Sequence, residues 1–232
     1  KSVRDTSQLL YILEGNQPEA PYNLSPLETD ILEKSIDFTK LKIGFTTKSP
    51  VGSHVSADAV AAVKKAVQYF EKKGASVEES TPIYDGVELM HAYYAMNGAE
   101  TAAMMEKIEQ SLKRPLTPDD MEPMTWAIYQ YGKKLTAADY IQAFAKWDEA
   151  AKVMTDYHRS YDLYLTPTTA EVAPLLSTKF QSDELVNELQ MMDQQTKKEK
   201  AKQLVYEMFE KSLAVTPFTQ LANLTGQPAI SL

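Results

Sequence analysis

Residues 41–80 carry the feature that most constrains the fold, a succession of strand, helix and strand. Leu41–Thr46 is a short run with apolar and β-forming residues, and Ser76–Ser80 is a second one. Between them, Ser56 is a typical helix N-cap and Gly74 a typical helix stop. Apolar residues recur at helical spacing between the two caps, at Val60, Val63, Val67 and Phe70. Two strands joined by a helix predict a parallel βαβ unit with a right-handed crossover, and therefore an α/β fold.

The chain after this unit is rich in helical patterns over about residues 86–160. Gly86–Lys113 contains many alanines and methionines, which favour helices. Two further helices are expected up to residue 160, one starting at Thr117 and one at Thr136. Each threonine is followed by an aspartate in the first turn, and a proline follows Thr117, so both positions have helix-start signals.

The last third of the chain begins with another strand pattern, Asp162–Thr166. Ser182–Leu213 then predicts one long polar helix, over about residues 182–213. Its apolar positions are sparse, so we expect it to lie on the outside or to cover a cleft. These positions are Leu185, Leu189, Met192, Leu204 and Met208. The predicted fold is therefore a mixed β-sheet covered by helices.

The first forty residues carry weaker signals. Ser2, with Asp5 three residues later, has the pattern of an N-cap, and the short helix that it begins should end at Gly15. Residues 16–26 contain three prolines, which predicts an irregular connection. Residues 31–40 then predict a helical turn before the first strand.

Composition disfavours several classes of function. The chain of 232 residues has 24 Lys and Arg against 32 Asp and Glu, a formal net charge of -8. This balance disfavours nucleic-acid binding, and no apolar run approaches the roughly 18 to 20 residues that cross a membrane. The sequence has no cysteine, and His54, His91 and His158 lack the spacing of a metal motif. We expect a cytoplasmic protein without a cofactor or metal.

The last fifteen residues, Phe218–Leu232, form the most recognisable segment. Gln227–Leu232 predicts a strand entered through Pro228, where the missing N–H is tolerated. A natural C-terminus rarely falls inside an apolar strand, so we expect the sequence to be a piece of a longer protein. The strand should form only if a neighbour such as Asp162–Thr166 receives it. The phrase FTQLANLTGQPAISL resembles the closing half of the amidase signature family, hydrolases with a Ser, cis-Ser, Lys triad.

Three other segments are similar to phrases of the same family, and all four occur in the family's order. Lys1–Thr6 resembles the end of an "R-S-V-R-D" phrase, and Leu41–Phe45 resembles the strand that follows it. Tyr161–Thr168 is similar to a "Y-D-x-x-L-T-P-T" strand and turn. The resemblance covers nearly the whole chain. It implies that residues 1–232 are a single incomplete α/β domain, the C-terminal segment of an amidase.

The glycine- and serine-rich run that carries the family's nucleophile is absent from this sequence. All eight glycines are isolated, and neither Gly-Gly nor Gly-Ser-Ser occurs. The family's general-base lysine lies further upstream still. The resemblance therefore implies that the triad lies outside this chain, in an N-terminal remainder of the same protein. No catalytic residue is assigned here, and the chain alone should be inactive.

The segment His91–Glu100 is the best candidate for a substrate site. It places two tyrosines, an amide and Gly98 inside an alanine-rich helix. Glycine in a helix costs roughly 1 kcal/mol relative to alanine, so it indicates close packing, a kink or the approach of a ligand. In the family, the corresponding segment contributes to the substrate cleft. The resemblance implies that Asn97 orients a small-molecule amide substrate and that Met96 and Tyr94 form the pocket wall. The alternative is a kinked core helix with Asn97 turned to solvent.

Trp126 is the fourth candidate for substrate binding, because aromatic side chains are common in pocket walls. Core packing is the alternative. Residues 124–128 also differ from the basic "E-V-K-R-R-I" phrase of glutamine-using transamidase subunits. Within the family, the pattern is most similar to amidases related to 6-aminohexanoate-cyclic-dimer hydrolase.

The expected function is therefore scaffold and part of the substrate cleft of an enzyme that hydrolyses C–N amide bonds. The alternative is a non-catalytic helical interaction module derived from the amidase fold. Its adaptable contact face would be rich in methionine. The methionines concerned are Met90, Met96, Met104, Met105, Met191 and Met192.

Overall fold

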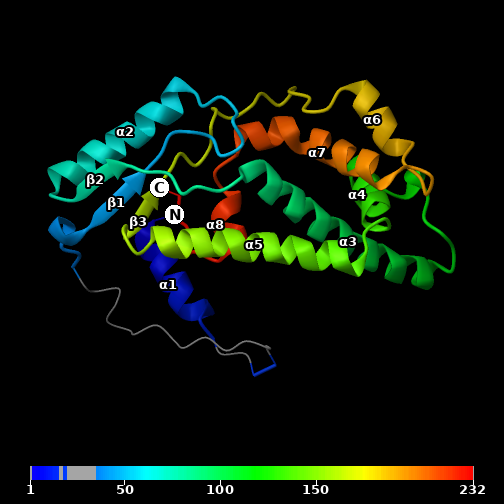
Figure 1. The fold of residues 1–232 in the computed structure, drawn as a ribbon, viewed down its shortest axis with the longest axis horizontal. Helices are drawn as coiled ribbons and strands as arrows, with labels where there is room; N and C mark the ends of the chain where they lie inside the picture. The colour runs from blue at the N-terminus through cyan, green and yellow to red at the C-terminus, as the bar shows by residue number, and fades with distance from the viewer. Residues whose placement is uncertain (1, 16–17, 20–34, 232) are drawn as a thin grey trace. The chain divides into compact units, whose positions relative to one another are not determined.

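The computed structural model describes residues 2–15, 18–19 and 35–231 (Figure 1). The chain divides into two units, Lys1–Phe38 and Thr39–Leu232. In the first unit, the helix α1 (Val3–Leu13) begins after Ser2, whose hydroxyl accepts a hydrogen bond from the amide of Asp5 at 3.1 Å. This confirms the predicted N-cap. The connection predicted over residues 16–26, and the first part of the turn predicted over residues 31–40, lie largely outside the described residues.

The second unit contains a three-stranded parallel sheet in the order β2-β1-β3 (Figure 1). Its strands are β1 (Lys42–Phe45), β2 (Ser76–Glu79) and β3 (Leu163–Leu165). A short turn, η2 (Phe38–Lys40), precedes β1. The predicted α/β class is confirmed. The sheet was predicted to be mixed, but the strand pairs within the described residues are all parallel.

The predicted βαβ unit is present. The helix α2 (Ala57–Lys72) connects β1 to β2, and the Ser56 hydroxyl accepts a hydrogen bond from the amide of Ala59 at 3.3 Å. Val63 and Val67 on the predicted apolar stripe are buried. Gly74, with φ of 97°, follows the helix in a conformation that favours glycine. The local signals of the sequence therefore produced this unit as predicted.

Asp162 connects the third strand to the first. Its amide donates a hydrogen bond to the carbonyl oxygen of Lys42 at 2.8 Å. Its carboxylate in turn accepts one from the amide of Lys42, also at 2.8 Å. These two bonds fix the start of β3 beside the start of β1.

The helix-rich segment is confirmed, with one different start. It contains α3 (Gly86–Leu112), α4 (Pro123–Gly132) and α5 (Ala137–Tyr157). Thr136 caps α5 as predicted. Thr117 was predicted to begin a helix, but it begins only the single turn η3 (Pro118–Asp120). The helix cannot continue through Glu122, because a residue that precedes a proline is driven into an extended conformation.

The single helix predicted over residues 182–213 is wrong, because the structure has two helices there. They are α6 (Asp183–Gln190) and α7 (Lys198–Val215). Between them, the carboxylate of Asp193 accepts hydrogen bonds from the amides of Gln195 and Thr196 at 2.9 and 3.0 Å, and such a turn competes with helix. As expected for a helix on the outside, α7 keeps charged residues such as Lys200 and Lys211 exposed. It buries Ala201, Leu204, Val205, Met208 and Leu213.

The strand predicted at the C-terminal end is not formed over the described residues 227–231. The last helix, α8 (Gln220–Thr225), ends at Gly226, whose φ is 81°. The predicted receiving strand, β3, pairs with β1 and not with this segment. A hydrogen bond of 2.7 Å between the hydroxyls of Ser231 and Thr168 joins the segment to the turn after β3. Leu232 lies outside the described residues.

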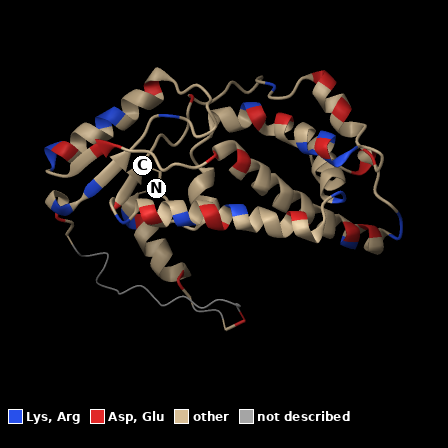
Figure 2. Ribbon diagram, in the orientation of Figure 1, with Lys and Arg blue, Asp and Glu red and all other residues tan. Residues whose placement is uncertain are grey.

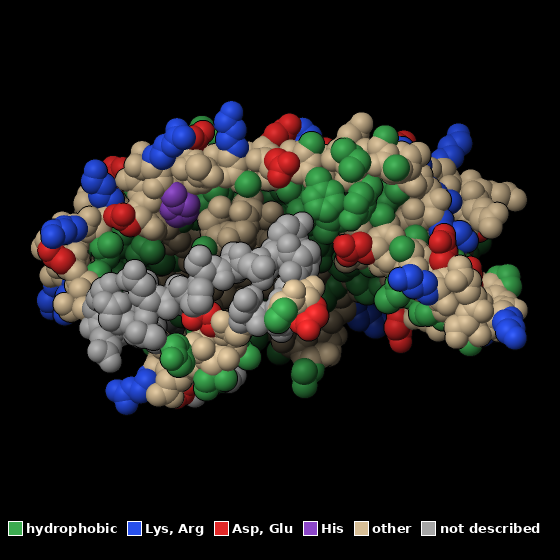
Figure 3. All heavy atoms as spheres, turned by 90° about the horizontal axis from the view of Figure 1, so that it is seen from below, with side chains coloured by type: hydrophobic (Ala, Val, Ile, Leu, Met, Phe, Trp, Pro, Cys, Tyr) green, Lys and Arg blue, Asp and Glu red, His purple; other side chains and the backbone are tan. Residues whose placement is uncertain are grey.

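The methionines do not form one exposed face, contrary to the prediction for an interaction module. Met90, Met105 and Met192 are buried, whereas Met104 and Met191 are exposed. Hydrophobic side chains do gather in places on the face of the molecule seen in Figure 3, beside charged ones. Acidic and basic residues are interspersed along the helices (Figure 2). A continuous methionine surface is therefore not available as a contact face.

Candidate functional site

Two glycines bring α3 and α4 into close contact. A Cβ atom added to Gly132 would overlap the carbonyl oxygen of Gly98 and would lie 2.9 Å from the Cβ of Ala102. A Cβ added to Gly98 would lie 3.2 Å from the ring of Tyr131. Among the roles predicted for Gly98, the structure thus shows close packing.

Tyr94 lies in the core behind this contact. Its side chain is 5% exposed, and its ring stacks on that of Phe209 in α7, with centroids 4.9 Å apart. Burial raises the pKa of its hydroxyl above the usual value. Met96 and Asn97 are partly exposed. Within the described part of the chain, the Asn97 amide has no hydrogen-bond partner.

Trp126 is buried in a second cluster of apolar residues. It is 6% exposed, and its indole N–H donates a hydrogen bond to the carbonyl oxygen of Met192 at 2.8 Å. Its ring makes an edge contact with Tyr129 at 5.8 Å. This is the packing role that the sequence left open. Of the four predicted residues, Met96 and Asn97 therefore reach the surface, and Tyr94 and Trp126 support the helices from within.

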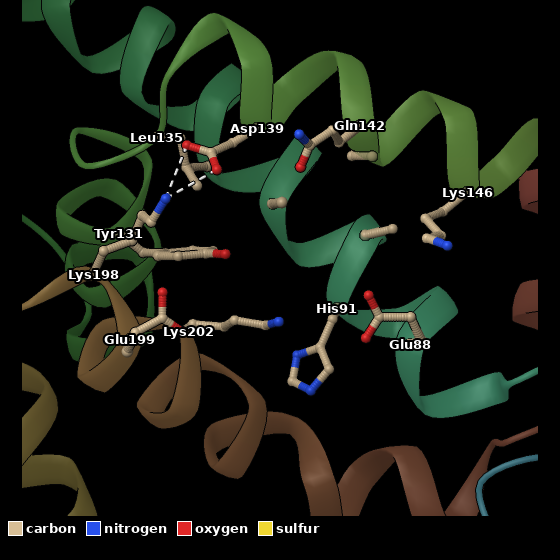
Figure 4. A pocket seen from close by; sticks show the side chains of 13 residues that line it. Glu88, His91, Tyr131, Leu135, Asp139, Gln142, Lys146, Lys198, Glu199 and Lys202 are labelled. Atoms are coloured by element: carbon tan, nitrogen blue, oxygen red, sulfur yellow. Dashed lines mark hydrogen bonds and ion pairs between the residues drawn. The ribbon is translucent and has the colours of Figure 1, made fainter.

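A hollow of about 180 Å³ lies between α3, α5 and α7 (Figure 4). The four predicted site residues do not line it. Successive helix residues are rotated by about 100°, so Asn97 faces almost opposite to Ala95, which lines the hollow. The polar side chains that line it are those of Glu88, His91, Tyr131, Asp139, Gln142, Lys146, Lys198, Glu199 and Lys202.

One edge of the hollow is closed by an ion pair. The ammonium group of Lys198 lies 2.9 Å from the carboxylate of Asp139, which also accepts hydrogen bonds from the amide and hydroxyl of Thr136 at 2.8 Å each. The Thr136 amide and the Lys198 ammonium lower the pKa of Asp139 from 3.8 to about 2. This edge is electrostatically satisfied and holds α5 against the start of α7.

His91 lies beside the hollow without a partner for one ring nitrogen. Its Nδ1 is buried and has no hydrogen bond, and its ring lies 4.7 Å from that of Tyr206. Burial and the nearby Lys202 lower its pKa, and Glu88 and Asp85 act in the opposite direction. His91 is therefore neutral at physiological pH.

The residues that line this hollow are not recognisable as a group in the sequence. In the sequence, His91 is only a histidine that lacks the spacing of a metal motif. Its neighbours Tyr131, Asp139 and Lys202 come from three other helices, separated by up to about a hundred residues. A charged side chain in each of several amphipathic helices is ordinary, so only the tertiary packing identifies these residues as a group.

The other two histidines have partners within the chain. His54 is exposed and lies 2.8 Å from Glu171, and His158 interacts with the carbonyl oxygen of Tyr161 at 3.0 Å, just beyond α5. Residues 2–15, 18–19 and 35–231 contain no group of three acidic or histidine side chains placed to hold a metal ion. Across the same residues, each helix is too short or too polar to span a bilayer.

Comparison with known proteins gives one consistent family. The family model described as Amidase matches residues 1–232. The chain is 36% identical over 190 residues to a lipoamidase of Enterococcus faecalis, covering 82% of the chain and 26% of that protein. It is 27% identical over 243 residues to a 6-aminohexanoate-cyclic-dimer hydrolase of Pseudomonas sp. strain NK87, covering 100% of the chain and 45% of that protein. The chain thus spans less than half the length of these relatives.

Solved structures of similar proteins share the fold. A 6-aminohexanoate cyclic dimer hydrolase complexed with substrate matches with a TM-score of 0.74 and 24% identity, over all of this chain and 46% of that one. A bacterial aryl acylamidase of the amidase signature enzymes matches with a TM-score of 0.63 and 16% identity, over 99% of this chain and 54% of that one. The arrangement of sheet and helices is therefore that of amidase signature enzymes.

Proposed function

This chain belongs to the amidase family, and from that membership we propose that it is the C-terminal part of an enzyme that hydrolyses C–N amide bonds. The observation that carries the proposal is the family match over residues 1–232. The similarity to a lipoamidase and to cyclic-dimer hydrolases supports it, because both names denote cleavage of an amide.

We place the Ser, cis-Ser, Lys triad in an N-terminal remainder of the same protein. The isolated glycines of this sequence support this division, as does its coverage of only 26% and 45% of two relatives. In that mechanism, serine attacks the amide carbonyl, the second serine and a neutral lysine move the proton, and backbone N–H groups stabilise the oxyanion. Residues 1–232 then form one incomplete α/β domain that supplies scaffold and part of the cleft.

Within this chain, we assign the substrate contact to one face of α3. Asn97 would orient the amide, since its side chain can both donate and accept a hydrogen bond. Met96 would provide an adaptable apolar wall beside it. Tyr94 and Trp126, both buried, would hold α3 and α4 in place behind that wall.

The substrate is a small-molecule amide, and the relatives suggest which compounds to assay. Lipoamide, the cyclic dimer of 6-aminohexanoate and an aryl acylamide represent the substrates implied by their names. The whole protein should hydrolyse at least one of them, and the purified 232-residue chain should hydrolyse none. Turnover by the 232-residue chain would overturn the placement of the triad. Failure of the whole protein on all amides would favour the interaction module.

Asn97→Ala tests the assigned contact in the whole protein. Loss of a substrate hydrogen bond should lower kcat/KM about tenfold, which corresponds to about 1.4 kcal/mol. Lys107→Ala, nearly three turns further along α3 and exposed, is the control and should leave kcat/KM unchanged. Equal kcat/KM values for Asn97→Ala and the parent would remove Asn97 from the substrate site.

A further inference from the structure

The hydroxyl of Tyr131 lines the hollow between α3, α5 and α7. Tyr131 is 3% exposed, and Figure 4 shows its hydroxyl pointing into the hollow. Among the residues that the structure describes, the hydroxyl has no hydrogen-bond partner. Burial and the carboxylates of Asp139 and Glu199 raise its pKa to about 12, so it remains a donor at neutral pH. The hydroxyl is therefore available to donate a hydrogen bond to a ligand in the hollow.

Charges of both signs face the same space. Lys202 enters it from the side of Tyr131, and Glu88 lies across from them (Figure 4). Within the described residues, Lys202, Glu88 and Glu199 have no ion-pair partner within 4 Å. Lys146 is already 3.0 Å from Glu149, and Lys198 is paired with Asp139. The groups available to a ligand are therefore one ammonium, two carboxylates, the phenol and the Gln142 amide.

This set of groups decides the class of ligand. A simple anion could use Lys202 and Tyr131, but it would leave the carboxylate of Glu88, across the hollow, without a partner. A simple cation could use Glu88, but it would face Lys202. A molecule with both a carboxylate and an ammonium group satisfies both sides. A volume of about 180 Å³ is below the roughly 300 to 1,000 Å³ of sites for drug-sized ligands, so the molecule is small.

We propose that this hollow binds a small zwitterion, a compact amino acid whose carboxylate contacts Tyr131 and Lys202 and whose ammonium group contacts Glu88. The inference goes beyond the proposed function, since it requires no amide hydrolysis. The hollow also lies on a different face of α3 from Asn97. His91 also lines the same space.

The test is a ligand-observed NMR titration of the full-length protein. The probes are glycine, β-alanine and 4-aminobutyrate, compared with acetate and methylammonium, which each carry one of the two charges. At least one zwitterion should bind with a Kd about tenfold or more below those of the single-charge probes. Equal affinity for acetate or methylammonium, or no binding of any zwitterion, would overturn the proposal. Because binding is measured without turnover, failure of this site and failure of the amidase proposal are separate results.

Matched variants locate the binding. Tyr131→Phe should weaken the Kd about tenfold, because a hydrogen bond to a charged group is worth about 1.5 kcal/mol or more. Lys202→Gln should weaken it by at least as much. Tyr69→Phe and Lys211→Gln change exposed residues outside the hollow and should leave it unchanged. Binding that survives both Tyr131→Phe and Lys202→Gln would place the ligand elsewhere and contradict the proposal.

Discussion

The sheet unit and the helical layer of residues 39–232 are built by different means. We use sheet unit for β1, α2, β2 and β3, and helical layer for α3, α4, α5, α6 and α7. The sheet unit is held by caps and strand pairs close to one another in sequence, apart from β3. The helical layer is held by contacts between distant residues, such as Gly98 with Gly132 and Trp126 with Met192.

The two regions should therefore differ in the substitutions that they tolerate without loss of stability. Removal of a cap in the sheet unit removes one hydrogen bond and leaves the packing in place. A change at a helix crossing moves two backbones, because the interior is close-packed and cannot yield locally. The same division applies to function, since the proposed substrate residues and the charged hollow both belong to the helical layer. The predictions below compare the two regions, from the largest expected effect to the smallest.

Gly132→Val should be the most destabilising change. The added side chain would overlap the Gly98 carbonyl, and overpacking against backbone should cost roughly 3 kcal/mol of unfolding free energy. Urea unfolding measures this directly. Gly52→Ala is the comparison beside the sheet unit. Its position has φ of 73° and no atom within 4 Å of the added Cβ, so only backbone strain of roughly 1 kcal/mol is expected. Equal losses of unfolding free energy in the two variants would show that the contact between α3 and α4 is not packed more tightly than a surface turn.

Trp126→Phe should cost about 2 kcal/mol of unfolding free energy. It leaves the carbonyl of Met192 without its indole donor inside the core and removes ring volume. Trp147→Phe is a matched control, because the indole nitrogen of Trp147 is buried without any hydrogen bond. Chemical unfolding should therefore give a smaller loss for Trp147→Phe. The opposite order would mean that the bond to Met192 does not hold α4 to the turn after α6.

The success of the sequence predictions follows the same division. Ser56, Gly74 and the apolar stripe between them act within a few turns of the chain, so the sheet unit could be predicted. The break between α6 and α7 depends on the turn at Asp193, which the polar helical pattern concealed. The α/β class and the family were confirmed, but neither indicates that Tyr131, His91 and Lys202 meet. Their meeting depends on how three helices, α3, α4 and α7, pack, which periodicity alone does not determine.

Ser56→Ala should cost about 1 kcal/mol, because the first turn of α2 loses its side-chain acceptor. Ser56→Asp restores an acceptor and should recover most of the loss. Thr136→Ala makes the corresponding change in the helical layer, where Thr136 and Asp139 cap each other. Thermal unfolding of the three variants compares the loss of one N-cap in the sheet unit with the loss of one N-cap in the helical layer. A loss well above that of a cap in either helix would indicate that the residue also supports distant packing.

Asp139→Asn should have the smallest effect at neutral pH, below about 1 kcal/mol, because the pair with Lys198 is partly exposed. The variant is informative because its effect should depend on pH. The folded pKa of Asp139 is lowered from 3.8 to about 2, so the folded state binds fewer protons and the carboxylate stabilises the fold above pH 3.8. That contribution is lost as the pH falls from about 4 to about 2, and the difference between parent and Asp139→Asn should shrink over the same window.

Urea unfolding at a series of pH values measures this difference, and the sheet unit supplies the control. Glu79 in β2 lies 3.2 Å from Lys48 in a pair that is more exposed, with side chains 53% and 77% accessible. Solvent screens such a pair, so Glu79→Gln should change the unfolding free energy little at any pH. If both variants follow the same pH curve, the carboxylate of Asp139 does not strengthen the junction of α5 and α7. If only Asp139→Asn loses its effect toward pH 2, acid weakens the helical layer at this junction before it alters the sheet unit.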